Sequence, residues 1–475
     1  MFNNLQEFYF FLPVILLSAG ILISVTIELY SKKSVISLSW FSVVLFFIVG
    51  ILSLATIDSK SVILQNMVAT GGYVNIFYAL FNFTGMIVCL LSVDYLKKYD
   101  ALFGEYYILL QTSVLGMMLM AAAKDLFVIF LGLELMSVSF YVLAGINRKR
   151  GSAIEASLKY FLLGAFATGF IVYGIALIYG TAETTSLDVI ASKFIQLSNN
   201  LLFITGVLLF LIGFSFKIAA FPFHMWVPDV YQGSPSTISA FFSTGGKTAA
   251  FAAIIVSLFA LFTSGASKII TPYLSVISVL SMFFGSIVAI SQTNIKRMLA
   301  YSSISNAGYL LIGLAAGNSE GIAGVIFYLT AYTLMNLGAF GIVSIIESKE
   351  EKNLDIYDYS GLSNKQPLLS ALLSLLMFSL AGIPPFAGFF GKYYIFMAAI
   401  KSDLTILAIL GVLSSVISVY FYLRIVVLLY FKESQYDLNV LKTNSGMIAL
   451  YISSLLIVIL GIFPGKFLSI INSTL

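Results

Sequence analysis

The sequence has 475 residues, of which 60% are hydrophobic and only 10% are charged. A soluble protein of this length carries many more charges on its surface, so the composition excludes an ordinary soluble domain and indicates a polytopic membrane protein. The net charge of +4 does not indicate nucleic-acid binding, because the basic residues lie in separate loops rather than in one stripe.

About 14 apolar stretches follow one another, each close to the roughly 20 residues that cross a bilayer as a helix. Helices satisfy their own backbone hydrogen bonds, so we expect an all-α fold of about 14 transmembrane helices in one transmembrane domain, 1–475. The expected spans are 8–29, 35–57, 73–93, 104–122, 125–146, 153–180, 201–232, 236–263, 271–291, 298–316, 321–347, 367–400, 404–431 and 446–467. Two connections are longer, 181–200 and 347–365, and the charges of the second predict a solvated face.

Lysine and arginine outside the spans concentrate in loops that follow odd-numbered spans, such as 32–33, 97–98 and 148–150. Loops rich in these residues stay on the cytoplasmic side of a membrane. We therefore expect the odd-numbered loops in the cytoplasm and both termini on the outer side.

Charged residues also lie inside the expected spans, where a charge at the helix centre costs about 2.5–3.5 kcal/mol. The acids are Glu134 and Glu155, and the bases are Lys159, Lys217, Lys247, Lys392 and Arg424. One interpretation is that they form structural ion pairs, which the i, i+4 spacing of Glu155 and Lys159 favours. Arg424 lies near a span end, where its side chain reaches the membrane surface. The other interpretation is a functional charged site.

Prolines interrupt two of the longer spans. Pro222 lies in span 7, and Pro384 and Pro385 lie in span 12. Each proline removes a helical hydrogen bond and clashes with the preceding turn, so we expect broken helices 7 and 12. Irregular backbone within a membrane occurs where it is buried or lines water, and paired broken helices are typical of ion pathways in transporters.

The two halves of the chain also show a weak repeat. Residues 134–145 align without gaps with 302–313, which matches Ser137 with Ser305 and Tyr141 with Tyr309. Broken span 7 then matches broken span 12, five helices later. An odd number of helices per unit inverts the second copy relative to the first.

The candidate site residues are Glu134, Lys217, His224, Lys247 and Lys392, with Glu155 and Lys159 as further candidates. Burial disfavours the charged form of a lysine, so buried lysines near a carboxylate and a histidine predict a proton relay. His224 is the single histidine and Cys89 the single cysteine. Neither has the partners that a zinc site or an iron–sulfur cluster needs, so no metal or cofactor is expected in this chain.

Five motifs carry a resemblance to a known family: GLELMS, FPFHMWVPDVYQGSP, GGK, MLAYSSISNAGY and GIPPFAGFFGK. With them the chain resembles, over nearly its whole length, the antiporter-like, proton-translocating membrane subunits of respiratory complex I, the bacterial NADH-quinone oxidoreductase. The resemblance implies a non-redox subunit of a hetero-oligomeric translocase in the bacterial inner membrane. Its partners would be other membrane subunits and the lipid bilayer. NADH, FMN, the iron–sulfur clusters and quinone would belong to the wider complex.

The resemblance also implies two inverted five-helix units, 104–263 and 271–431, flanked by helices within 1–100 and by a last helix, 446–467. Glu134 and Lys217 would be the coupling pair, Lys247 the central relay, and Lys392 the residue at the far exit. Two alternatives stay open, a subunit of a cation/proton antiporter and a structural subunit that no longer moves protons.

Overall fold

The computed structural model describes residues 5–31, 34–99, 103–263, 267–348, 352–434, 440 and 443–475. The first part contains α1 Leu5–Tyr30, α2 Ser34–Ala55, β1 Ser61–Ile63, β2 Val68–Thr70, α3 Tyr73–Lys98, α4 Glu105–Ala122, α5 Leu126–Ala144, α6 Gly151–Ala182, α7 Leu187–Ser192 and α8 Phe194–Leu197. The middle contains α9 Leu201–Lys217, α10 Trp226–Gly233, α11 Ser236–Phe241, the π-helical turn η1 Phe242–Gly246, α12 Lys247–Thr263, α13 Ser267–Ser291, α14 Ile295–Ala315 and α15 Ser319–Ile346. The last part contains the 3-10 helix η2 Ile356–Tyr359, α16 Leu362–Lys365, α17 Pro367–Ala381, α18 Ala387–Lys401, α19 Thr405–Phe431, α20 Asn444–Ile462 and α21 Pro464–Thr474.

Polar side chains fix the starts of several helices. Asp125 accepts a hydrogen bond from the amide of Phe127 (2.8 Å) at the start of α5. Asn294 accepts bonds from the first amides of α14, and Asn318 accepts one from Gly321 (2.7 Å) at the start of α15. These residues satisfy amides that have no partner within the helix, which is why each of these helices begins where it does.

Within the described residues, 12 helices are long and apolar enough to cross a membrane. Two shorter apolar helices, Leu201–Lys217 and Pro367–Ala381, lie where spans 7 and 12 were expected. The first is followed by a non-helical segment and then α10, and the second by a non-helical segment and then α18. The prediction of a predominantly helical, multi-span membrane protein is confirmed.

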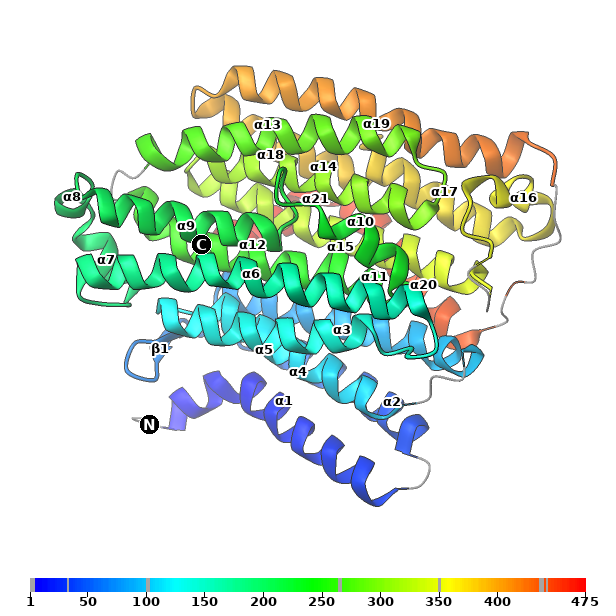
Figure 1. Cartoon of the computed structure of the whole chain (residues 1–475), viewed down its shortest axis with the longest axis horizontal. Coiled ribbons are helices and arrows are strands. Elements are labelled where there is room, and N and C mark those ends of the chain that lie inside the picture. Colours follow the sequence, from blue (N-terminus) through cyan, green and yellow to red (C-terminus); the bar gives the residue numbers. More distant parts are fainter. Residues whose placement is uncertain are drawn as a thin grey trace.

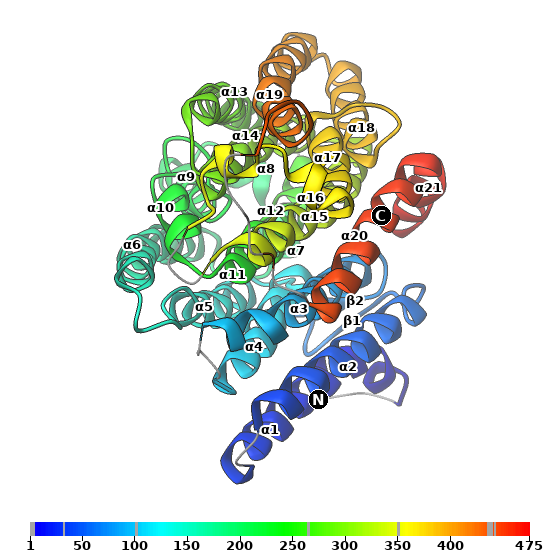
Figure 2. The ribbon, with the colours of Figure 1, turned by 90° about the vertical axis from the view of Figure 1, so that its right-hand side faces the viewer.

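The long helices run roughly parallel, with α1 at one edge and α13 and α19 at the opposite edge (Figure 1). Viewed from the end, α15 lies near the middle of the bundle, α6 at one side, and α20 with α21 at the other (Figure 2). α15 packs against α3, α11, α14, α17, α18 and α20. The segment Ser236–Leu258, α14 and α15 are almost entirely buried, whereas α1, α2 and α6 expose much of their apolar surface. The buried helices therefore form the centre, and the exposed ones provide the lipid-facing surface.

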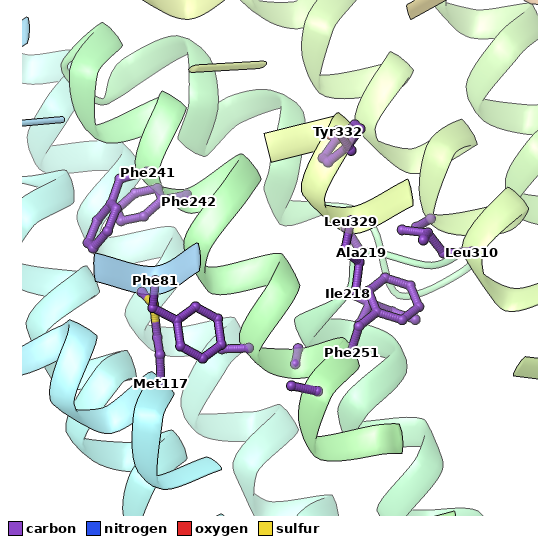
Figure 3. Close-up of a cluster of buried hydrophobic side chains, with 14 of the residues drawn as sticks. Phe81, Met117, Ile218, Ala219, Phe241, Phe242, Phe251, Leu310, Leu329 and Tyr332 are labelled. Carbon is purple, nitrogen blue, oxygen red and sulfur yellow. The ribbon is translucent and has the colours of Figure 1, made fainter. Parts of the chain in front are cut away.

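Large apolar side chains fill the space between these central helices. Figure 3 shows part of this cluster, with Phe241 and Phe242 near the start of the π-helical turn and Phe251 further along α12. Ile218 and Ala219, from the non-helical segment after α9, belong to the same cluster. The interrupted segment is thus held inside the bundle rather than at its surface.

The segment 347–365 differs from its prediction. We expected its charges to form a solvated face, which is wrong for its first residue, because Glu347 is fully buried. Ile356 and Tyr359 are buried too, and Asp355 bridges to Asn294 at the start of α14. In the described part of the segment, Ile356 and Tyr359 are covered by the bundle, and Glu347 has Arg150 and Ser236 as partners; residues 349–351 lie outside the described part of the chain. Arg424, expected near a span end, donates to the carbonyl oxygens of Ile290 (2.8 Å) and Gln292 (2.7 Å).

Glycines allow two pairs of neighbouring helices to approach closely. A Cβ atom on Gly132 of α5 would lie 2.8 Å from the carbonyl oxygen of Gly116 on α4, and one on Gly116 would lie 2.6 Å from that of Gly132. Gly174 and Gly206 face each other in the same way between α6 and α9. Small residues at such crossings let backbones meet, which is how helices associate within membranes.

We expect Gly132→Ala to separate α4 from α5 and to lower the free energy of unfolding by about 1–3 kcal/mol, the usual cost of overpacking. Thermal unfolding of the detergent-solubilised protein, followed by intrinsic fluorescence, measures the change. Gly169→Ala is the matched control, because a Cβ atom there meets nothing within 4 Å. An equal effect of the two substitutions would contradict the close-packing argument.

Candidate functional site

Three lysines lie buried inside the bundle, each near a departure from regular α-helix. Lys217 is the last residue of α9, Lys247 follows the π-helical turn, and Lys392 lies on α18 just after the non-helical segment 382–386. Their exposed fractions are 6%, 2% and 4%. Among the described residues, no carboxylate forms an ion pair with any of the three within 4.0 Å. Neutral groups alone hold these side chains.

Lys217 is held by the hydroxyl groups of α5. Its Nζ donates to Ser137 Oγ (2.9 Å) and to Tyr141 Oη (3.3 Å), and it lies 5.7 Å from the centre of the Tyr141 ring. Both partners lie on one face of α5, since residues four apart are neighbours on a helix surface. Aromatic ring faces attract cations, so the tyrosine contributes through its ring as well.

Glu134 lies one helical turn before Ser137 on the same helix. Its Oε1 accepts a hydrogen bond from Thr168 Oγ1 of α6 at 2.9 Å. Glu134 is half-buried, and its carboxylate makes no ion pair with Lys217 within 4.0 Å. The structure thus places Glu134 about one turn before Ser137, the α5 residue that accepts a hydrogen bond from Lys217 of α9.

Lys247 is held by α14 and α15. Its Nζ donates to the carbonyl oxygen of Ser303 (2.5 Å) and to the hydroxyl group of the same residue. The ring of Tyr332 on α15 lies 5.7 Å away, and the next residue, Thr248, has its hydroxyl 3.4 Å from that of Thr333. The π-helical turn that precedes Lys247 is a local departure of a kind that often occurs at functional positions.

Lys392 is held by the end of α17, by α14 and by α19. Its Nζ donates to Ser415 Oγ (2.9 Å) and, more weakly, to the carbonyl oxygens of Leu380 and Ala381 (both 3.4 Å). The ring centre of Tyr309 on α14 lies 4.7 Å away. Carbonyl groups at a helix end lack a partner within the helix, and the end is partly negative, so it is a favourable place for an ammonium group.

His224 lies in the non-helical segment between α9 and α10. Its ring packs against Phe221 and Phe284, with centroid distances of 5.3 Å and 4.5 Å. The side chain is buried, and its Nδ1 has no hydrogen-bond partner. The structure places His224 between aromatic rings, without a hydrogen bond to Lys217 or Lys247.

The three prolines lie in the non-helical segments. Pro222 follows Lys217 and precedes His224, while Pro384 and Pro385 lie between α17 and α18. Gly382 ends α17 with a φ of 83°, a left-handed conformation that glycine adopts without strain. At the second break, the carbonyl oxygens of Leu380 and Ala381 accept weak hydrogen bonds from Lys392.

Glu155 and Lys159 form a separate group at one end of the bundle. Lys159 Nζ lies 2.6 Å from Glu155 and 2.9 Å from Asp229, whose other oxygen lies 2.7 Å from Arg297. All four side chains are more than a quarter exposed. Glu155, Lys159 and Asp229 line a cavity of about 180 Å³, and the group of four joins α6, α10 and α14 rather than the three buried lysines.

Sequence reasoning missed the neutral partners of the lysines. Ser303 lies in the motif MLAYSSISNAGY, but nothing in the motif marked it as a partner of Lys247; Tyr332 and Ser415 carried no sequence signal, because hydroxyl residues are common in membrane helices. Ser137 and Tyr141 did carry one, since the repeat alignment singled them out, but as markers of similarity rather than as partners of Lys217.

A hydroxyl network lies between Lys247 and Lys392; it consists of Ser302, Asn306, Tyr328 and Tyr422. Ser302 Oγ and Tyr422 Oη are 2.5 Å apart, Asn306 Nδ2 donates to Tyr422 Oη at 3.2 Å, and Tyr328 Oη donates to Asn306 Oδ1 at 2.5 Å. The same helix, α14, carries Ser303 beside Lys247 and Tyr309 beside Lys392. α14 therefore presents polar groups along much of the distance between the two lysines.

The described residues offer no group of three or more His, Cys, Asp or Glu side chains that could hold a metal ion. Cys89 is buried in α3 as a free thiol. The titratable and polar groups that the described site offers are amines, hydroxyl groups and a carboxylate.

Comparisons with known proteins match most of the chain to one family. Residues 123–418 match the family described as NADH:quinone oxidoreductase/Mrp antiporter, transmembrane. NADH-quinone oxidoreductase subunit N 1 of Chloroherpeton thalassium is 43% identical over 468 residues, covering 97% of this chain and 96% of the relative. Subunit N of Trichlorobacter lovleyi is 45% identical over 413 residues, covering 86% and 83%.

Solved structures show the same fold. A chain in respiratory complex I from Thermus thermophilus with bound Aureothin superimposes with a TM-score of 0.83 at 29% identity, covering 96% of this chain and 98% of that one. A chain of the Mrp complex from Dietzia sp. superimposes with a TM-score of 0.87 at 18% identity, covering 97% of this chain and 96% of that one. At this low identity the likeness shows a shared fold only. By sequence and by fold, this chain belongs to the NADH:quinone oxidoreductase/Mrp antiporter transmembrane family, in its group of NADH-quinone oxidoreductase N subunits.

Proposed function

We propose that this chain is a proton-translocating membrane subunit of an NADH:quinone oxidoreductase, in which electron transfer in other subunits drives proton movement through a central relay. The observation that carries the proposal is the set of three buried lysines without a carboxylate partner, Lys217, Lys247 and Lys392. Several charges buried within membrane helices are costly, and they mark ion pathways more often than structural positions. Family membership agrees with this function.

Proton exchange is the chemistry that suits these three side chains. Burial disfavours the charged form of an amine, and an amine without an ion pair has no close opposite charge to hold its proton in place. Hydroxyl groups, which surround Lys217, Lys247 and Lys392, both donate and accept hydrogen bonds. Each lysine is thus able to pass a proton to a neighbouring group when its surroundings change.

Glu134 and Lys217 are the proposed switch. With the carboxylate on Thr168 and the amine on Ser137 and Tyr141, the pair is open in this structure. A rotation that brings the two side chains together would hold the proton on Lys217, and separation would release it. The two side chains come from different helices, α5 and α9, and Ser137, which accepts the bond from Lys217, lies about one turn from Glu134.

From Lys217 the proposed relay passes His224 and Lys247 and ends at Lys392. The buried, unpartnered Nδ1 of His224 is free to bind a proton or a water molecule on this route. The hydroxyl network around Asn306 supports the second half of the route, because it lies between Lys247 and Lys392. Glu155 and Lys159 would serve at the entrance, where their cavity meets the bundle end.

Two inverted five-helix units, 104–263 and 271–431, are the proposed internal organisation, with 1–100 and 446–467 outside them and 14 spans in all. Matched surroundings support this. Lys217 lies beside Tyr141 of α5, and Lys392 lies beside Tyr309 of α14, the residue that aligns with Tyr141. In the first half α5 provides a tyrosine ring for a buried lysine, and in the second half α14 does the same.

In the cell, the protein would be a multi-pass subunit of a hetero-oligomeric complex in the bacterial inner membrane, beside other membrane subunits and lipid. Both termini are proposed to face the periplasm, since lysine and arginine concentrate in the odd-numbered loops. NADH, FMN, the iron–sulfur clusters and quinone would be bound by the wider complex. The alternative function is that of a subunit of a cation/proton antiporter. A chain of the Mrp complex has the same fold, so the fold does not separate the two functions and an experiment is needed.

Association with the redox complex separates these two functions. We expect the chain to migrate with NADH dehydrogenase activity when membranes are solubilised mildly and resolved by blue-native electrophoresis with an in-gel NADH stain. Detection of an epitope tag on this chain provides the measurement. Migration only in bands without NADH activity would support the antiporter and overturn the complex I assignment.

Removal of the switch should impair translocation. General acid–base groups typically contribute about 10²-fold or more, so we expect Lys217→Ala and Glu134→Gln to slow proton translocation at least about tenfold in assembled complex. NADH-driven acidification of inverted membrane vesicles, divided by NADH oxidation, provides the measurement. Lys401→Ala is the control, because Lys401 is exposed and pairs with Glu320 at 2.8 Å. An unchanged number of protons per NADH would refute the relay.

Replacing the amine of Lys392, at the far end of the proposed relay, with a guanidinium group provides a sharper test. Arginine stays protonated, so Lys392→Arg keeps the positive charge but removes proton exchange. We expect the substitution to lower translocation nearly as much as Lys392→Ala does, in the same vesicle assay. Lys401→Arg, on the same helix, is the matched control. Normal translocation by Lys392→Arg would mean that this position needs only a fixed charge.

A further inference from the structure

Glu347 is a fully buried carboxylate that the proposed relay does not use. It follows the last residue of α15. Its side chain accepts hydrogen bonds from Ser236 Oγ (2.5 Å), Tyr95 Oη (3.1 Å) and Arg150 (3.2 Å). Lys98 donates to its carbonyl oxygen. A carboxylate without exposure is rare unless it is paired and hydrogen-bonded, as this one is.

The carboxylate is ionised at neutral pH. Burial raises the pKa of Glu347, but the nearby charges of Lys296 and Arg150 and the bond from Ser236 outweigh it, so that the pKa lies below its ordinary value. Lys296 itself is buried and donates to the carbonyl oxygen of Ser234 at 2.7 Å. The ionised carboxylate therefore balances two cations at one end of the bundle.

The Glu347 cluster joins the three elements that surround Lys247. Ser236 is the first residue of α11, which continues through the π-helical turn to Lys247. Lys296 lies at the start of α14, the helix of Ser303. Glu347 itself ends α15, the helix of Tyr332. At about 1.5 Å per residue, Lys247, Ser303 and Tyr332 lie roughly 10–23 Å along these helices from the cluster.

We propose that Glu347 is a positioning residue for Lys247, in that its ionised carboxylate fixes α11, α14 and α15 relative to one another and so places the amine of Lys247 against Ser303 and Tyr332. This inference rests on the proposed function, in which Lys247 is the central relay. The cluster also includes Tyr95 of α3 and Arg150 before α6, so it anchors the central helices to their neighbours.

A neutral side chain of the same shape does not serve this purpose. Glutamine at position 347 would remove the negative charge that Glu347 places beside Arg150 and Lys296, and removing one partner of a buried ion pair is costly. Its amide would also meet the hydroxyl donors of Ser236 and Tyr95 with one acceptor oxygen in place of two. The helix starts and ends that meet at Glu347 would then shift, and Lys247 would move relative to Ser303.

The test compares Glu347→Gln with Glu320→Gln in assembled complex, by protons moved per NADH oxidised in inverted vesicles. Glu320 is the matched control, because it lies at the opposite end of α15 and pairs with the exposed Lys401. We expect Glu347→Gln to lower the ratio at least about twofold and Glu320→Gln to leave it unchanged. A lower amount of assembled complex with a normal ratio would overturn the inference, because it would indicate a structural role alone.

A double-variant cycle with Lys247→Ala tests the route of the effect. Residues that act through one group are not additive, so Glu347→Gln should lower the ratio no further once Lys247 is alanine. Full additivity of the two substitutions would overturn the inference. If Lys247→Ala alone leaves translocation unchanged, the relay itself fails. If Lys247→Ala impairs translocation and Glu347→Gln does not, the relay stands and only the positioning role fails.

Discussion

The burial of positive charge without an opposite charge is the constraint on which the rest of the structure depends. A free ammonium group inside a membrane protein must satisfy three N–H donors. Lys217, Lys247 and Lys392 do so with hydroxyl groups, carbonyl oxygens and tyrosine rings. Neutral partners stabilise the ammonium ion less than a carboxylate would, and the proposed relay depends on that incomplete stabilisation.

The interrupted helices follow from the same constraint. Carbonyl groups inside a continuous helix already accept a bond within the helix, as that of Ser303 does while it also accepts from Lys247, whereas the carbonyl groups at a helix end have no partner within the helix. The end of α17 frees the carbonyl groups of Leu380 and Ala381, and both face Lys392. Glycine and proline at the break are therefore part of the lysine's environment as well as of the backbone.

Much of this organisation was predictable from sequence, because span length, proline position and buried charge are local signals. The prolines of 222, 384 and 385 predicted where helical structure stops, and the alignment of Tyr141 with Tyr309 singled out two residues that each lie beside a buried lysine. Contacts between distant segments were not predictable. Glu347 looked like one charge in a polar loop, since its partners Tyr95, Arg150 and Ser236 lie far away in the chain.

The π-helical turn Phe242–Gly246 determines which way Lys247 faces. A π-turn holds one residue more than an α-turn, and each residue of an α-helix turns the chain by about 100°. All side chains of α12 are therefore rotated by roughly that angle from the direction that an unbroken helix from Ser236 would give them. The contact of Lys247 with Ser303 depends on this single inserted residue, and the turn's two glycines, Gly245 and Gly246, lie directly before the lysine.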